Sequence, residues 1–208
     1  HYWDIYLEPL DNGYFDWTHG NAFYFDEEDS SIYLSFRNLN RITKIHYPSG
    51  DVIWNMGHEF VFHDIWNGGQ EYISGDVDFG HDLGFRWQHS ISLIGPDKNV
   101  LILDNAGPGG VTTRALEIAV SGGPGNYQAE FVFEYVFPDY LDIAGNVQRL
   151  ENGNYLITVN DNPFAPAKTF EISPSGELIW EATYNGTVYL WRASRIPQCS
   201  VSLGDING

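Results

Sequence analysis

Two short motifs in the sequence pair a tryptophan with a histidine, and their residue types and spacing could carry chemistry. The first is Trp17-x-His19, with Asn21 just downstream, and the second is Trp87-x-His89. A neutral imidazole can act as a nucleophile or exchange protons near neutral pH. The motifs therefore mark candidate positions for nucleophilic or acid–base chemistry.

A third polar side chain, Arg37, ends the strand-like run that follows the first motif. Its guanidinium has a fixed fork of N–H donors that matches anionic oxygen atoms. Plainer roles stay open, because both motif histidines can hydrogen-bond backbone groups and Arg37 can pair with a surface carboxylate. Three further histidines, His58, His63 and His81, are spaced too irregularly for a compact set of metal ligands, so no metal site is predicted there.

The elements that must position these residues repeat along the chain. Residues 41–54 and 168–180 share a β-rich run, a Pro-Ser-Gly turn and a second run that ends in Ile-Trp. Proline sets φ for the turn and glycine supplies a positive φ, so each unit predicts a β-hairpin. A looser copy spans residues 114–135. Two more strand-like runs precede each hairpin: 22–25 with 32–36, 90–94 with 100–103, and 147–150 with 155–159.

Four short strands in a unit of about 50 residues, repeated three times, are typical of β-propeller blades. We therefore predict an all-β fold with about three four-stranded antiparallel blades. We predict a partial propeller over residues 1–197, with blades near 14–57, 86–137 and 144–183 and a closing strand at 187–196. An insertion is predicted at 57–85, and a linker or tail that starts a further module is predicted at 198–208.

The innermost strand of a propeller blade begins at the central channel, so residues just before it gather around one axis. The two Trp-x-His motifs precede the innermost strands of adjacent predicted blades. We therefore expect His19 and His89 to occupy equivalent places that face the same channel mouth. A propeller closes only when a ring of blades removes the exposed sheet edges. Further blades from a longer parent chain, or a second copy in a homo-oligomer, would have to complete the ring.

The charge of the chain limits its partners. Ten Lys and Arg stand against 28 Asp and Glu, which gives a net charge of −18. Such a surface repels phosphate backbones and anionic membranes, so nucleic acid is excluded as a partner. No apolar run approaches the roughly 18 residues of a membrane span. A single cysteine, Cys199, excludes an intrachain disulfide.

The sequence resembles the arylsulfotransferases, also called aryl-sulfate sulfotransferases, a family of six-bladed propellers. The resemblance covers roughly residues 14–197 and depends on the order and spacing of several short segments. These segments are His19-Gly-Asn21, Ile32-Tyr-Leu-Ser-x-Arg37, Gly50-Asp-Val-Ile-Trp54, Gln88-His89, Leu103-Asp-Asn105, residues 147–154 and Trp191-Arg-Ala193.

This resemblance implies transfer of a sulfuryl group from an aryl sulfate to a phenol through a sulfohistidine, with no nucleotide sulfate donor and no other cofactor. It implies that His89 is the nucleophile, that His19 and Asn21 form the family's His-x-Asn pair, and that Arg37 binds the sulfate. The candidate substrate-binding residues are Trp17, Trp87, Asn146 and Arg192. The faces of Trp17, Trp87 and Trp191 could bind an aryl ring, and packing within the blades stays open as the plainer role of these tryptophans.

Two departures from the family leave a second function open. Another active-site histidine of the family would come from blades upstream of the region that the resemblance covers. Asn146 lies close to the position where the family has a threonine, and it could substitute as a donor. The resemblance implies a secreted, extracellular or periplasmic protein. The chain is then either an arylsulfotransferase, provided the missing blades are supplied, or a non-catalytic secreted propeller for binding or assembly.

Overall fold

The described part of the chain is built of antiparallel β-strands. The structure is a computed structural model that describes residues 18–57, 60–64, 70–74, 78–79, 83–106, 112–137, 144–160, 166–186 and 190–196. Within these ranges there is no helix, and so none long and apolar enough to cross a membrane. The strands form three four-stranded antiparallel sheets and one two-stranded hairpin, which confirms the predicted fold class.

Each four-stranded sheet is a meander in which sequential strands pair. The first sheet contains β1 (Gly20–Asp26), β2 (Ser31–Phe36), β3 (Arg41–His46) and β4 (Val52–Gly57). The second contains β7 (His89–Ile94), β8 (Asn99–Asp104), β9 (Arg114–Ser121) and β10 (Gln128–Val136). The third contains β11 (Asn146–Arg149), β12 (Tyr155–Val159), β13 (Lys168–Ile172) and β14 (Leu178–Thr183). The hairpin of β5 (Phe60–Asp64) and β6 (Gln70–Ser74) lies within the predicted insertion.

The Pro-Ser-Gly turns form for the reason that their residues indicate. Gly50 has a φ of 80° and donates its backbone N–H to the carbonyl of His46 at 2.8 Å. Gly176 has a φ of 84° and donates to the carbonyl of Ser173 at 2.9 Å. Glycine reaches this left-handed region without a steric cost. The turns therefore close the outer hairpins β3–β4 and β13–β14 where the sequence predicted hairpins.

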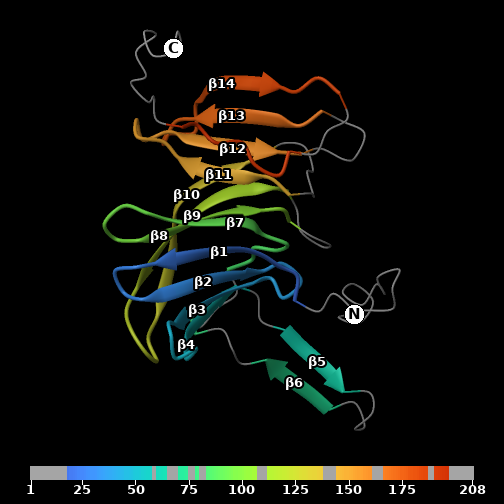
Figure 1. Ribbon diagram of the computed structural model, residues 1–208. Coiled ribbons are helices and arrows are strands. Elements are labelled where there is room, and N and C mark those ends of the chain that lie inside the picture. Colours follow the sequence, from blue (N-terminus) through green and yellow to red (C-terminus); the bar gives the residue numbers. More distant parts are fainter. Residues whose placement is uncertain are drawn as a thin grey trace, which may run out of the picture.

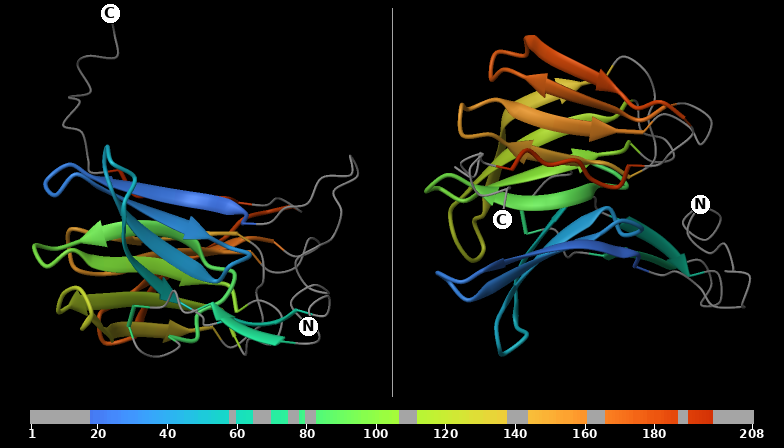
Figure 2. Two further views of the ribbon diagram at one scale, coloured as in Figure 1. Left: turned by 90° about the horizontal axis from the view of Figure 1, so that it is seen from below. Right: turned by 45° about the horizontal axis from the view of Figure 1, so that its top comes forward.

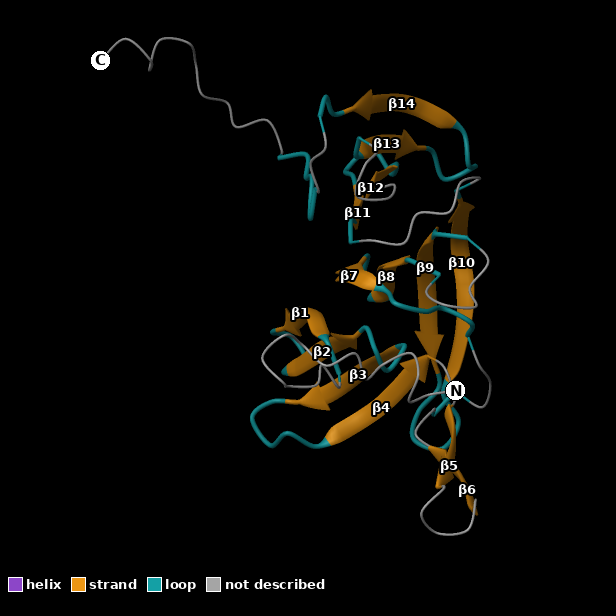
Figure 3. Cartoon of the chain, turned by 90° about the vertical axis from the view of Figure 1, so that its right-hand side faces the viewer, coloured by secondary structure: helices purple, strands orange, loops and turns teal. Residues whose placement is uncertain are grey.

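The three sheets lie next to one another as successive blades. Figure 1 shows the third, second and first sheets one above another, and the right-hand view of Figure 2 shows them fanned out. Strand β7 contacts both β1 and β11, so the inner strands of the three sheets are neighbours. Figure 3 shows these inner strands together, with β10 at the far edge of the second sheet.

Two apolar cores hold the sheets together, and the second sheet contributes to both. On β8, Val100 and Ile102 face the core shared with the first sheet, which also contains Trp54. Leu101 and Leu103 face the opposite core, shared with the third sheet. All four β8 residues are fully buried. The second sheet is therefore covered on both faces, and this fixes the start of β7 between its neighbours.

The described parts of the insertion pack against the first sheet. Asp78 donates its backbone N–H to the carbonyl of Asn55 at 3.0 Å, and its carboxylate accepts the Asn55 N–H at 2.7 Å. Phe79 is buried, with its ring centroid 5.4 Å from that of Trp54. The insertion thus contributes a side chain to the core between the first and second sheets.

Candidate functional site

The strand registers show which residues of the three sheets are equivalent. In each sheet the inner strand begins with one cross-strand pair: Gly20 with Phe36, His89 with Leu103, and Asn146 with Thr158. His89 is therefore equivalent to Gly20, whereas His19 precedes β1 by one residue. The expected equivalence of the two imidazoles is wrong by one position, because the first strand pairs align His89 with Gly20 and not with His19.

The structure nevertheless brings His19, Arg37 and His89 together. The backbone N–H of Arg37 donates to the carbonyl of His19 at 3.0 Å, which joins the entry of β1 to the exit of β2. The charges of Arg37 and His19 both lower the pKa of His89, which begins the neighbouring inner strand. Two imidazoles and a guanidinium from two sheets thus share one electrostatic environment.

His89 is a buried, neutral imidazole at neutral pH. Its side chain is held through Nδ1, which lies 2.7 Å from Asn105 Oδ1 and 3.0 Å from the Trp87 carbonyl oxygen. Burial lowers the pKa of His89 to about 4, and the nearby charge of Arg37 acts in the same direction, while the two hydrogen bonds oppose the shift. The ring therefore keeps a nitrogen lone pair at neutral pH.

Arg37 is held over Trp87. Its guanidinium carbon lies 3.6 Å from the centroid of the Trp87 ring, and its Nη1 donates to Asn38 Oδ1 at 2.9 Å. Stacking of this kind orients a guanidinium while leaving N–H donors at its edge. One face of Trp87 is thus covered by Arg37. The buried Trp87 Nε1 has no hydrogen-bond partner among the described residues, so it is a further donor beside the site.

Two amide side chains join the first and second sheets next to His89. Asn21 donates from Nδ2 to the Gln88 carbonyl at 2.7 Å, and its buried Oδ1 has no partner within the described ranges. Gln88 is fully buried, and its Nε2 lies within 3.2 Å of acceptors on β2 and β3. These acceptors are Ser35 Oγ and the carbonyl oxygens of Phe36 and Arg41. The start of β7 is therefore fixed to the first sheet by hydrogen bonds as well as by apolar packing.

The candidates from the third sheet are placed differently. Both ends of the Asn146 amide bind the backbone of Ala193, with Nδ2 donating to its carbonyl at 3.0 Å and Oδ1 accepting its N–H at 2.9 Å. Arg192 is exposed. Asn146 thus serves to hold residues 190–196 against the third sheet. Outside the described residues lie Trp17, His58 and His81, and of His63 only the backbone is described.

The roles of Asn105 and Gln88 were not predicted, although Asn105 contacts His89 and Gln88 contacts β2 and β3. The signal that could have indicated them is an amide residue next to a strand of buried apolar residues. Such an amide must satisfy its hydrogen bonds within the protein.

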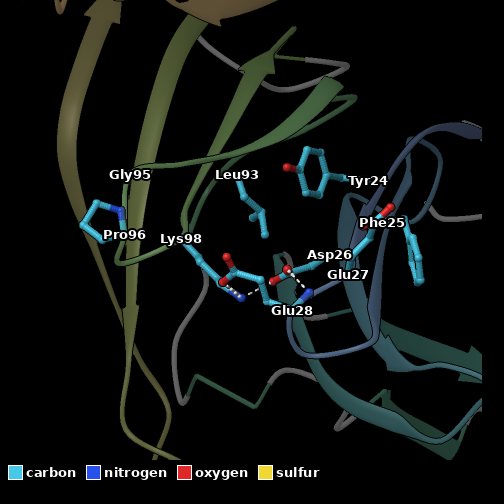
Figure 4. Close-up of a pocket in the computed structure, with 9 residues that line it drawn as sticks. All are labelled: Tyr24, Phe25, Asp26, Glu27, Glu28, Leu93, Gly95, Pro96 and Lys98. Atoms are coloured by element: carbon cyan, nitrogen blue, oxygen red, sulfur yellow. Dashed lines mark hydrogen bonds and ion pairs between the residues drawn. The ribbon is translucent and has the colours of Figure 1, made fainter.

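A separate cavity of about 420 Å³ lies at the other end of β1 and β7. Figure 4 shows its lining, with Lys98 between Asp26 and Glu28. Lys98 Nζ lies 2.6 Å from Asp26 Oδ2 and 3.1 Å from Glu28 Oε2. The cavity is lined by the last residues of β1 and the turn after β7, whereas His19 and His89 lie at the strand starts. It is therefore distinct from the site around His89.

A comparison with known protein families gives a match over most of the chain. The family model described as Arylsulfotransferase (ASST) matches residues 6–159, which is more than half of the chain. The match spans the first two sheets, the strands β11 and β12, and the positions of His19, Arg37 and His89. A search of curated proteins gave no match to the chain. The extent of the family match shows that the chain belongs to the arylsulfotransferase family.

Proposed function

We propose that the protein transfers a sulfuryl group from an aryl sulfate to a phenolic acceptor, with His89 as the covalent nucleophile. The observation that carries the proposal is the environment of His89: a buried imidazole that is neutral at neutral pH, with its pKa lowered to about 4, and that lies close to Arg37 and His19. A neutral imidazole can take the sulfuryl group and divide one difficult displacement into two easier ones.

The first step forms a bond between His89 Nε2 and the sulfur of the aryl sulfate. The sulfur–oxygen bond to the aryl group breaks, and the phenolate leaves with that electron pair. In the second step the oxygen of the acceptor phenol attacks the same sulfur, the nitrogen–sulfur bond breaks, and the neutral imidazole is restored. The proton lost by the acceptor balances the proton gained by the released phenolate, so the exchange consumes no net acid or base.

Charge develops on oxygen in both steps, and positioned hydrogen-bond donors would stabilise it. Arg37, oriented by Trp87 and Asn38, would bind the oxygens of the sulfuryl group. His19 and Asn21 would act near the phenolic oxygen. Preorganised donors of this kind typically contribute about 2.7–4 kcal/mol each to transition-state stabilisation.

The active protein in this proposal is a closed propeller in the extracellular space or periplasm. Three sheets leave the outer faces of the first and third sheets without neighbours of the same kind among the described residues. Further blades, from a longer parent chain or from a second copy, would close the ring and supply the remaining side chains. The net charge of −18 fits small aromatic substrates better than polyanionic partners.

The test uses 4-nitrophenyl sulfate as donor and phenol as acceptor, with the chain in its full-length context. We expect turnover that His89→Ala abolishes and His63→Ala leaves unchanged. Mass spectrometry of the protein quenched without acceptor should show one added sulfuryl group on the peptide that contains His89. Turnover that survives His89→Ala would contradict the proposal.

A non-catalytic binding or assembly propeller is the second candidate. It is favoured by Asn146, which stands near the position of a family threonine and has both ends of its amide bound to Ala193. A full-length protein that binds aryl sulfates, yet neither turns them over nor forms a sulfohistidine, would establish this second function.

A further inference from the structure

The side chain of Asn105 bridges His89 and the backbone that enters the third sheet. It is 1% exposed and directly follows β8. From this geometry we infer that Asn105 is a positioning residue that fixes the tautomer of His89, with the proton on Nδ1 and the lone pair on Nε2. The inference deepens the proposed function and depends on it for its kinetic consequence, but the tautomer itself can be measured without turnover.

The orientation of the Asn105 amide follows from its second partner. Asn105 Nδ2 lies 2.9 Å from the carbonyl oxygen of Ala144, an atom that can only accept. The nitrogen of the amide must therefore face Ala144, and the oxygen must face His89. An amide assigned in the opposite sense would place two acceptors against each other.

The orientation of the amide then decides the protonation of the imidazole. Asn105 Oδ1 lies 2.7 Å from His89 Nδ1 and can only accept, so Nδ1 must donate. The carbonyl oxygen of Trp87, 3.0 Å from the same nitrogen, makes the same demand. A neutral imidazole carries one proton. With that proton on Nδ1, the lone pair lies on Nε2, the atom that would attack sulfur.

The turn that carries Asn105 is held rigidly by its neighbour Asp104. The Oδ1 atom of Asp104 accepts the backbone N–H groups of Arg86 and Ala106, both at 2.9 Å. Its Oδ2 accepts from Arg114 Nη2 at 2.6 Å. These bonds connect the residue before Trp87 to the residue after Asn105. The backbone segments that carry Asn105 and His89 are therefore held in a fixed position relative to each other.

An amide suits this role better than a carboxylate would. A carboxylate at position 105 would also accept from Nδ1, but its negative charge would favour the imidazolium. Protonation would remove the lone pair on Nε2. Asn105 thus orients the ring while the ring stays neutral beside Arg37 and His19.

The third sheet supplies a matched control. Asn105 lies two residues after Leu103, the first partner of β7, and Asn160 lies two residues after Thr158, the first partner of β11. Asn160 is 2% exposed, and its amide binds both backbone groups of Leu190 instead of an imidazole. Asn160→Leu therefore removes an equally buried amide from the equivalent position without touching His89.

The test measures the tautomer of His89 from long-range ¹H–¹⁵N spectra of the full chain, with His89→Gln used to assign the signals. We expect the Nδ1–H tautomer in the wild type and in Asn160→Leu. Asn105→Leu should show a mixture of tautomers. Asn105→Asp should keep the Nδ1–H form, because it keeps the acceptor, but its His89 should titrate at a higher pH.

In the full-length enzyme, Asn105→Leu should lower kcat roughly ten- to a hundredfold with KM changed less than about threefold.

A wild-type His89 with its proton on Nε2 would overturn the inference, and so would an Asn105→Leu spectrum identical to that of the wild type. If Asn105→Leu does not fold, Asn105→Asp decides, since an unchanged titration of His89 would show that residue 105 does not act on the ring. An inactive wild-type protein with the Nδ1–H tautomer would count against the proposed function alone. An active protein with the Nε2–H tautomer would count against the role of Asn105 alone.

Discussion

The inner strands of the second and third sheets begin at equivalent positions, occupied by His89 and Asn146. In the second sheet Asn105 holds an imidazole. In the third sheet three amides bind the backbone of a chain segment instead: Asn146 binds Ala193, Asn160 binds Leu190, and Gln148 binds Arg195. Equivalent backbone positions thus hold an imidazole in the second sheet and a segment of irregular backbone in the third.

The largest effect should separate Arg37, which lies close to His89, from Arg195 of the third sheet. Under the proposed mechanism, Arg37→Ala should lower kcat/KM for sulfuryl transfer about 10²- to 10³-fold, because the guanidinium proposed to stabilise the sulfuryl oxygens is lost. Arg195→Ala, at the third sheet, should leave kcat/KM unchanged, since Arg195 pairs with Glu171 at 2.6 Å. Steady-state kinetics on both variants measure the contrast. Equal losses in the two would remove the distinction between the sheets.

The second prediction concerns acid stability at the second sheet. Burial lowers the pKa of His89 from 6.5 to about 4, so the unfolded chain binds more protons than the folded chain between these values. The contribution of neutral His89 to the free energy of unfolding is therefore fully present above pH 6.5 and is lost as the pH falls through 4. This loss amounts to about 3 kcal/mol. Urea unfolding at a series of pH values should show this loss in the wild type. In His89→Gln the dependence between pH 6.5 and 4 should be smaller, and an unchanged slope would contradict the prediction.

The third prediction concerns the bound segment of the third sheet. Asn160→Ala removes both hydrogen bonds to Leu190 from a buried side chain, and it should destabilise the protein by about 1–3 kcal/mol. Gln148→Ala should cost less, because its bonds to Arg195 are exposed and water can replace them. Urea unfolding at neutral pH compares the two variants. A larger loss for Gln148→Ala would show that burial does not govern how strongly the segment is held.

The sequence predicts the sheets well because local chemistry decides them. The turns at Gly50 and Gly176 need a positive φ, and the alternation around them sets the hairpins. The site is predicted less completely. The offset of one residue between His19 and His89 depends on where β1 and β7 begin to pair with β2 and β8, and the shared Trp-x-His motif does not indicate that position. The role of Asn105 depends on Ala144, which lies 39 residues away in the chain and is brought close by packing between sheets.

The smallest expected effect lies in a second pH window at the third sheet. The hydrogen bond from Arg195, with help from Asn154 and Asn152, lowers the pKa of Glu171 from 4.5 to about 2. The folded chain thus binds fewer protons than the unfolded chain between these values, so the stabilisation is present above pH 4.5 and lost as the pH falls through 2. Because water screens the half-exposed Arg195 side chain, its ion pair with Glu171 should contribute under about 1 kcal/mol. Glu171→Gln should flatten the stability curve below pH 4.5 and leave the window between 6.5 and 4 intact. If it also changed that upper window, Glu171 and His89 would be coupled, and the contrast between the second and third sheets would have to be replaced by a single ionisable network.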